Sequence, residues 1–354
     1  MNISTFPILQ KQSRYFPSIV LLFLFFTVVS ATNPLPEEIQ SNAKQVIDLV
    51  CKEEFKSAEE TAKRIVKKYP ENPAGYFFVA TALESWMSYY EDNKKEDEFY
   101  RYCDLVIEKG EKILNKDSTD EWAMFFIGGA EGYKGTYEAH YERWITAFRY
   151  GWRGVSWFVK LSEMKSEIVD INYGIGSYDY WRSALMKTLW WMPGVKDKRE
   201  EGIKKLYLAL EKGTYTRVAA SAALIEILIN ENRIEEALPI AEKMVMLYPT
   251  STMFLWGKGR ILFGLGHLDE AQKIFSFLLK RYESDNIDNH FNSILCHYWL
   301  ARIAFVQENY KNSLEQVTAM EAYQCSDNIK KLLDKYFSES HSMRRKINSV
   351  LEKK

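Results

Sequence analysis

Apolar positions between Val218 and Glu283 recur in two helix–turn–helix units of the same phase. Ala237 and Ala271 occupy the same place in the second helix of each unit, and they lie 34 residues apart. We expect a small side chain there because helices cross closely at that place. Since one hairpin cannot bury its apolar face alone, a fixed period of this length predicts hairpins that stack on their neighbours.

The same phase occurs near the start of the chain. Ala58 precedes Pro70 by 12 residues, and Ala237 precedes Pro249 by the same 12 residues. The sequence therefore predicts an all-α fold, a tetratricopeptide-type helical-hairpin solenoid with a right-handed superhelix. We expect a single domain over residues 32–354, with regular repeats at 37–72 and 214–322, irregular repeats at 73–213 and a capping helix at 327–351.

Residues 1–31 are predicted to be a secretory signal peptide. Lys11 and Arg14 precede an apolar run from Ser18 to Ser30, and small residues lead up to a cleavage point after Ala31. The run is shorter than the roughly 20 residues that a membrane-spanning helix needs. A cleaved signal, which makes the protein periplasmic or secreted, is the favoured interpretation, and a retained N-terminal anchor is the alternative.

Charge argues against a nucleic-acid partner. The chain has 47 Lys and Arg against 48 Asp and Glu, a formal net charge of −1, and loss of Lys11 and Arg14 with the signal lowers it to −3. A surface that binds phosphates needs an excess of basic residues. The basic stretch Lys63–Lys68 follows Glu59 and Glu60, a pattern typical of a solvated helix face.

Seven of the ten tryptophans lie between residues 122 and 191. Six aromatic residues of this region are candidates for the wall of a cleft: Tyr133, Tyr137, Trp144, Tyr178, Trp181 and Trp190. Two interpretations remain open. The rings either fill wide gaps between long helices as core, or they line a pocket for a small or lipidic ligand.

Glycines cluster in the same region. Gly128, Gly132 and Gly135 fall along one expected helix, where each costs about 1 kcal/mol relative to alanine, so their clustering suggests the close approach of another helix. Farther along, Gly174 and Gly176 lack the preceding strand and the third glycine of a dinucleotide-binding loop.

The chain resembles tetratricopeptide-repeat proteins, and its middle is similar to a bacterial group of exported proteins with this repeat. In that group a glycine-rich helix precedes G-x-G-x-Y-x-Y-W, an aromatic-Pro-Gly turn and R-E-x-G. The matching segments here are Phe126–Gly135, Gly174–Trp181, Trp191–Gly194 and Arg199–Gly202. The resemblance covers most of the chain after the signal. It implies a fold and a compartment, and it supplies no reaction, catalytic residue or cofactor.

In such repeats the first helices line a concave groove. Glu226, Arg260 and Arg302 take one equivalent groove position, and Trp256 and Tyr298 take another. Arginine and aromatic side chains together are good anchors for a peptide or an anionic ligand. A surface ion pair between Glu226 and Arg260, worth little, is the alternative interpretation. The lysine and asparagine of a chaperone-type carboxylate clamp are not at these positions, which argues against chaperone tails as partners.

The sequence predicts neither a catalytic set nor a metal site. His140 and Glu142 are two residues apart and therefore lie on different faces of a helix, while His290 and His297 have no cysteine or carboxylate at ligand spacing. Motifs for a nucleophile elbow, a phosphate loop or a zincin are absent. Four cysteines form no Cys-x-x-Cys, so that either two of them pair in an oxidising compartment or they are small buried thiols: Cys51, Cys103, Cys296 and Cys325.

We therefore expect a non-catalytic, exported scaffold or adaptor that binds a protein or peptide in the cell envelope without a cofactor, with peripheral association with the envelope as an additional option. The alternative is a small-molecule or lipid-binding protein that uses the aromatic cleft of residues 122–191. The identity of the partner and the oligomeric state are left open by the sequence.

Overall fold

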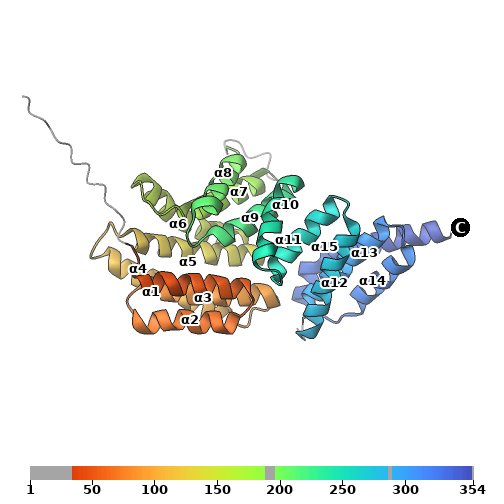
Figure 1. Cartoon of the computed structure of the whole chain (residues 1–354), viewed down its shortest axis with the longest axis horizontal. Coiled ribbons are helices and arrows are strands. Elements are labelled where there is room, and N and C mark those ends of the chain that lie inside the picture. The colour runs from red at the N-terminus through yellow and green to blue at the C-terminus, as the bar shows by residue number, and fades with distance from the viewer. Residues whose placement is uncertain (1–33, 188–195, 286–288, 353–354) are drawn as a thin grey trace, which may run out of the picture. The chain divides into compact units, whose positions relative to one another are not determined.

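The computed structural model describes residues 34–187, 196–285 and 289–352, and the residues from Thr32 onward form one compact unit. Within the described ranges the chain forms fifteen α-helices and no strand (Figure 1). The helices are α1 (Glu37–Cys51), α2 (Phe55–Lys68), α3 (Pro73–Tyr90), α4 (Glu96–Leu114), α5 (Glu121–His140), α6 (Trp144–Glu163), α7 (Ile171–Lys187), α8 (Arg199–Lys212), α9 (Arg217–Asn230), α10 (Ile234–Leu247), α11 (Thr252–Gly264), α12 (Leu268–Ser284), α13 (Phe291–Val306), α14 (Tyr310–Ala322) and α15 (Asp327–Leu351).

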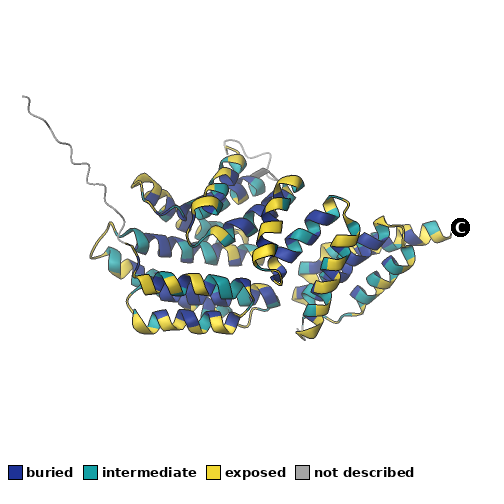
Figure 2. Cartoon of the chain, in the orientation of Figure 1, coloured by how far each residue is buried: buried dark blue, intermediate teal, exposed yellow. Residues whose placement is uncertain are grey.

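Consecutive helices pack against each other as antiparallel hairpins, and the odd-numbered helices from α1 to α11 also pack against one another. The odd-numbered helices therefore form one layer and the even-numbered helices the other, as in a stack of helical hairpins. Buried residues gather where helices face one another, and exposed residues follow the outer sides (Figure 2). The predicted all-α hairpin solenoid of the tetratricopeptide type is confirmed.

Small residues mark the close crossings in the regular repeats. Ala58 in α2, Ala237 in α10 and Ala271 in α12 have no exposed surface. Gly259 in α11 likewise marks a close helix crossing, because a Cβ atom there would lie 2.9 Å from the ring of Phe275. The period in the sequence therefore reflects one recurring packing contact.

Backbone meets backbone in the irregular middle. A Cβ atom on Gly135 of α5 would lie 2.9 Å from the backbone nitrogen of Gly151 in α6. A Cβ atom on Gly154 of α6 would lie 2.7 Å from the carbonyl oxygen of Gly128 in α5. Only glycine lets two helix backbones come so near, so the close approach predicted from the glycine cluster is confirmed.

The last helix, α15, packs on both helices of the preceding hairpin. Ile329 and Leu333 bury themselves beside Ile294 of α13, and Met343 and Ile347 beside Val317 of α14. This is the place that the first helix of a further repeat would occupy, so α15 covers an apolar surface that α13 and α14 would otherwise expose.

Candidate functional site

A cavity of about 770 Å³ opens on the layer of odd-numbered helices. Its wall includes side chains of α1, α3, α9, α11, α13 and α15, and the even-numbered helices add Phe55 of α2 and Tyr282 of α12. The five residues predicted to line a groove all belong to this wall: Glu226, Trp256, Arg260, Tyr298 and Arg302. The structure thus brings together the groove positions that the repeat phase selects on α9, α11 and α13.

The cavity is bounded because the first hairpins meet the later repeats. Glu53, between α1 and α2, accepts a hydrogen bond from the backbone nitrogen of Thr252 (2.5 Å) and pairs with Arg281 (2.9 Å). Tyr89, near the end of α3, donates a hydrogen bond to Asp285. Segments 199 residues apart in the chain are joined in this way. We call the interactions of Glu53, Phe55 and Tyr89–Tyr90 with Thr252, Arg281–Asp285 and Asn289–Asn292 the closure contact.

Two asparagine side chains and a group of rings complete the closure contact. Asn289 donates to the backbone carbonyl of Tyr90 (2.7 Å), and Asn292 donates to that of Tyr89 (2.9 Å). The ring of Tyr89 lies 5.3 Å from that of Phe55 and 5.6 Å from that of Tyr282. The contact therefore combines an aromatic interior with directional hydrogen bonds to main-chain groups.

Arg260 and Glu226 form the ion pair that the sequence offered as an alternative. One guanidinium nitrogen of Arg260 lies 2.7 Å from each carboxylate oxygen of Glu226. Such a partly exposed pair adds little stability. The indole nitrogen of Trp256 donates to the hydroxyl of Tyr282 (2.9 Å), which fixes the plane of the indole in the cavity wall.

Arg302 has a different environment from Arg260. Its guanidinium lies over three rings, at 4.7 Å from Phe263, 4.8 Å from Trp299 and 5.5 Å from Tyr298. Among the described residues no carboxylate lies within ion-pair distance of it. The rings hold the cation in place, the Tyr298 hydroxyl is a hydrogen-bond partner for it, and no described carboxylate takes its remaining donors.

The helix α15 adds three residues that the sequence analysis missed: Lys335, Tyr336 and Glu339. The hydroxyl of Tyr298 donates to Glu339, and the ring of Tyr336 lies 5.0 Å from the ring of Tyr298. Burial raises the pKa of the Tyr298 hydroxyl above its ordinary value. The available signal was the place of α15, because a helix that caps the stack continues the layer of first helices.

The opposite wall comes from α3 and was also missed. Ser88 donates to Glu84 (2.9 Å), and burial raises the pKa of the Glu84 carboxyl. Glu91 lies 2.9 Å from the ring nitrogen of His140, and this hydrogen bond raises the pKa of His140. The cavity therefore has an acidic, hydroxyl-bearing wall on α3 and an arginine- and aromatic-rich wall on α11 and α13.

None of the described residues predicted to form the aromatic cleft lines the cavity of about 770 Å³. Tyr133 stacks on Phe77 at 5.0 Å and shares a hydrogen bond with Thr81, and Tyr137 is buried against Phe99. These two rings belong to the core, in agreement with the interpretation that the aromatic residues fill gaps between long helices.

The remaining members of that set lie elsewhere. Trp144 and Trp181 are exposed on α6 and α7, and the ring of Tyr178 lies 6.4 Å from that of Trp152. Trp190 falls outside the described residues. The glycine crossing explains the division, because it draws α5 and α6 together and leaves no room for a shared ring-lined space between them.

A smaller hollow of about 300 Å³ lies among α4, α5 and α6. Trp152 and Trp157 form part of its wall beside Glu131 and Arg153, which pair at 2.6 Å. Burial raises the pKa of the Glu131 carboxyl. Neither tryptophan was among the residues predicted to line a cleft.

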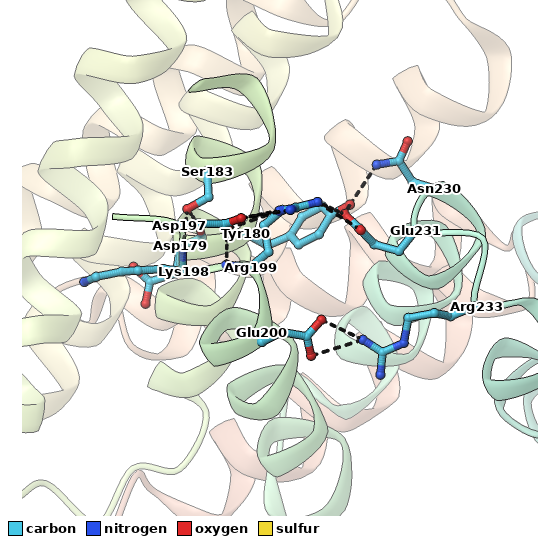
Figure 3. Close-up of polar contacts among 10 residues, drawn as sticks. All are labelled: Asp179, Tyr180, Ser183, Asp197, Lys198, Arg199, Glu200, Asn230, Glu231 and Arg233. Atoms are coloured by element: carbon cyan, nitrogen blue, oxygen red, sulfur yellow. Dashed lines mark hydrogen bonds and ion pairs between the residues drawn. The ribbon is translucent and has the colours of Figure 1, made fainter. Parts of the chain in front are cut away.

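Two of the motifs that carry the family resemblance, Gly174–Trp181 on α7 and Arg199–Gly202 on α8, meet at the junction with α9 (Figure 3). The Trp191–Gly194 motif lies outside the described residues. The hydroxyl of Tyr180 donates to Glu231 (2.9 Å) and accepts from Asn230 (2.7 Å). Arg199 donates to both oxygens of Glu231, at 2.9 and 3.0 Å, and also binds Asp197. Because every member of this network has a partner, we assign it to the packing of the junction.

A buried carboxylate, that of Asp170, fixes the same junction. Asp170 accepts hydrogen bonds from the backbone nitrogens of Thr214 (3.1 Å), Tyr215 (2.7 Å) and Thr216 (2.7 Å), and from the Thr216 hydroxyl (2.8 Å). This carboxylate shapes the turn that leads into α9. It therefore sets how the first regular repeat joins the irregular middle.

All four cysteines are free thiols, and three of them, Cys51, Cys103 and Cys296, are buried. Burial raises the pKa of Cys51 to about 12 and also raises the pKa values of Cys103 and Cys296. The sequence left open a disulfide or small buried thiols, and in the structure Cys51, Cys103 and Cys296 are buried thiols. In the described part of the chain, no cluster of three or more His, Cys, Asp or Glu side chains is arranged to hold a metal ion.

The predicted signal segment lies outside the described residues. Among residues 34–187, 196–285 and 289–352, no helix combines the length and the apolar character required to cross a bilayer.

No protein-family model and no curated protein matches the chain. Among solved structures it is similar to a tetratricopeptide repeat protein from Parabacteroides merdae, at 15% identity over 85% of this chain and 99% of that chain, with a TM-score of 0.36. It is also similar to the human IFIT1 dimer with m7Gppp-AAAA, at 11% identity over 90% and 83% of the two chains and a TM-score of 0.42. The TPR domain of P58(IPK) covers 87% of this chain with 99% of its own length, at 13% identity and a TM-score of 0.25. These likenesses concern the fold alone.

Proposed function

We propose that the chain is a non-catalytic scaffold or adaptor whose cavity holds an extended segment of a partner protein. The observation that supports this proposal is the common position of Glu226, Trp256, Arg260, Tyr298 and Arg302 in the wall of one cavity. A volume of about 770 Å³ falls within the range of roughly 300–1,000 Å³ common for ligand sites. It suits a few residues of a peptide and is too small for a folded domain.

The two walls suggest which chemistry the segment carries. Arg302 offers donors that no described carboxylate occupies, so an acidic side chain or a terminal carboxylate is its natural acceptor. Trp256 and Tyr298 offer flat apolar surface for a side chain next to that acidic group. On α3, Ser85 offers a hydroxyl to the backbone of the segment, and the Ser88 hydroxyl, which donates to Glu84, offers it an acceptor.

The test is to select binding peptides from a random phage-displayed library on the purified protein and to measure their affinities by titration calorimetry. We expect the selected peptides to contain an acidic group. Arg302→Ala is expected to weaken binding about tenfold or more, because a charge-assisted hydrogen bond contributes roughly 1.5–3 kcal/mol. Glu226→Gln is expected to tighten binding, because it releases the guanidinium of Arg260.

Arg233→Ala is the matched control. Unlike Arg302, Arg233 pairs with carboxylates, those of Glu200 and Glu236, and it does not line the cavity. Its replacement should leave the affinities unchanged. The proposal is wrong if no peptide is selected, or if Arg302→Ala and Arg233→Ala bind the selected peptides equally well.

The proposed setting is the cell envelope, after export. Lys11 and Arg14, the apolar run Ser18–Ser30 and the small residues up to Ala31 support it. Expression of the full sequence in a bacterial host, followed by intact-mass measurement of the periplasmic fraction, tests this point. We expect a species that begins at Thr32, and recovery of only the uncleaved chain from the cytosol would contradict it.

A further inference from the structure

The helix α6 presents a large apolar side chain to solvent every seven residues. Ile145 is 89% exposed, Trp152 61% and Val159 40%. Seven residues make about two turns of an α-helix, so the three side chains follow one line along its outer side. Single exposed apolar residues are ordinary on a protein surface, but an aligned row of three is not.

The neighbouring helix α7 extends this row sideways. Trp181 is 49% exposed, and Tyr178, one turn before it, places its ring 6.4 Å from the ring of Trp152. The surface therefore contains two exposed indole rings and an exposed isoleucine on two adjacent helices. We use the name outer face for the following exposed side chains of α6 and α7: Ile145, Arg149, Trp152, Arg153, Val159, Lys160 and Trp181.

A basic row runs beside the apolar row. At about 100° per residue, Arg149, Arg153 and Lys160 fall within about 40° of one another around α6, next to the line of Ile145 and Trp152. All three are exposed. Arg153 pairs with Glu131, whereas Arg149 and Lys160 contact the rings of Tyr150 and Trp157, with no described carboxylate in ion-pair range.

We propose that the outer face docks on the surface of an anionic lipid membrane. Tryptophan rings favour the boundary between headgroups and acyl chains, and an isoleucine and a valine beside them add apolar area that a shallow insertion buries. The basic row complements lipid phosphates and anionic headgroups. This charge complementarity favours a lipid surface over a protein groove. The inference does not rest on the proposed function, because the cavity and the outer face share no residue.

Vesicle co-sedimentation tests the proposal. Because residues 18–30 are themselves apolar, all proteins in the comparison begin at Thr32, the first residue of the compact unit. We expect binding to vesicles of equal parts phosphatidylcholine and phosphatidylglycerol, and little binding to pure phosphatidylcholine. Salt should weaken the binding, because it screens the basic row. Arg149→Ser with Lys160→Ser should reduce the partition about fivefold for each cation lost.

The apolar row is tested by the combined substitution of Ile145, Trp152 and Val159 with serine, which should reduce the partition at least tenfold. The matched control is the serine substitution of Leu208, Phe277 and Val306, which are also exposed but lie on α8, α12 and α13. Thermal unfolding of both triple variants establishes that they are folded. If a variant is unfolded, quenching of Trp152 fluorescence by brominated phosphatidylglycerol, with Trp152→Phe as the reference, gives the same information.

Two results would overturn the proposal. One is equal binding of the parent protein to anionic and neutral vesicles, or equal binding of the triple variant of Ile145, Trp152 and Val159 (the outer-face variant) and the triple control variant. The other is a dimer in sedimentation velocity that the outer-face variant loses, together with no vesicle binding by the parent protein. That second result would assign the outer face to contact with another copy of the chain.

Discussion

The regular repeats from α9 to α14 and the irregular middle from α3 to α8 bring helices together by different means. In the regular repeats a small residue meets a side chain, as Gly259 meets Phe275. In the middle a glycine meets the backbone of the next helix, as Gly154 meets Gly128. The first kind of contact keeps a period, and its inner positions share one cavity wall. The second kind has no such period, and its rings divide between the core and the outer face.

The joint between the two regions is expected to give the largest effect. Asp170→Ala removes the buried carboxylate that accepts hydrogen bonds from three backbone N–H groups in the turn before α9. We expect the free energy of unfolding to fall by about 3 kcal/mol or more, as measured by urea denaturation. Asp170→Asn keeps one acceptor and should lose about half as much. A loss below about 1 kcal/mol for the alanine variant would mean that the turn holds its shape without the carboxylate.

The same substitution in both regions sharpens the comparison. Gly154→Ala places a methyl group 2.7 Å from the carbonyl oxygen of Gly128, and a helix backbone cannot move aside alone. We expect a net loss of about 2 kcal/mol in the free energy of unfolding, the cost of overpacking less the helix propensity gained. Gly259→Ala meets the edge of the Phe275 ring, which can shift, so a change within about 1 kcal/mol of zero is expected.

Gly132→Ala is the control for helix propensity in the middle region. A Cβ atom on Gly132 meets nothing within 4 Å, so the variant should gain up to about 1 kcal/mol. Chemical denaturation of the three variants under the same conditions gives the order. If Gly154→Ala were as stable as Gly259→Ala, the two kinds of crossing would be energetically equivalent and the distinction would fail.

The smallest expected effect concerns the edge where the middle borders the cavity. The hydrogen bond to Glu91 raises the pKa of His140, so Glu91→Gln should lower that pKa towards its ordinary value, as followed by NMR of the imidazole. A raised pKa stabilises the fold fully below the unfolded value of about 6.5, and the stabilisation is lost as pH rises through the folded value. Since His140 is 43% exposed, less than about 1 kcal/mol is at stake. An unchanged pKa in the variant would contradict the assignment.

The repeat phase was enough to place the arginine- and aromatic-rich wall of the cavity. Glu226 and Arg260 are one period of 34 residues apart, so equivalent positions on successive first helices lie side by side. The α3 wall could not be found in this way. Its position depends on the closure contact, in which Glu53 and Tyr89 meet residues near 252 and 285, and no local pattern encodes that meeting.

The described residues do not support the prediction of one aromatic cleft, for a related reason. The spacing of Tyr133 and Tyr137 indicates that they share a helix face, but it does not indicate what that face packs against. The glycines of α5 and α6 settled the matter, because the contact of the two backbones turned these rings towards α3 and α4 and left Trp152 outside.

The sequence by itself determined the helices, their pairing and the order of the repeats, because these depend on contacts between neighbours in the chain. Only the tertiary structure decided that distant hairpins touch, that Arg302 lies among rings without a described carboxylate, and that one side of α6 remains uncovered. Small changes in the angle between successive hairpins add up along a stack. The meeting of its distant parts is therefore a property of the whole chain and of no single segment.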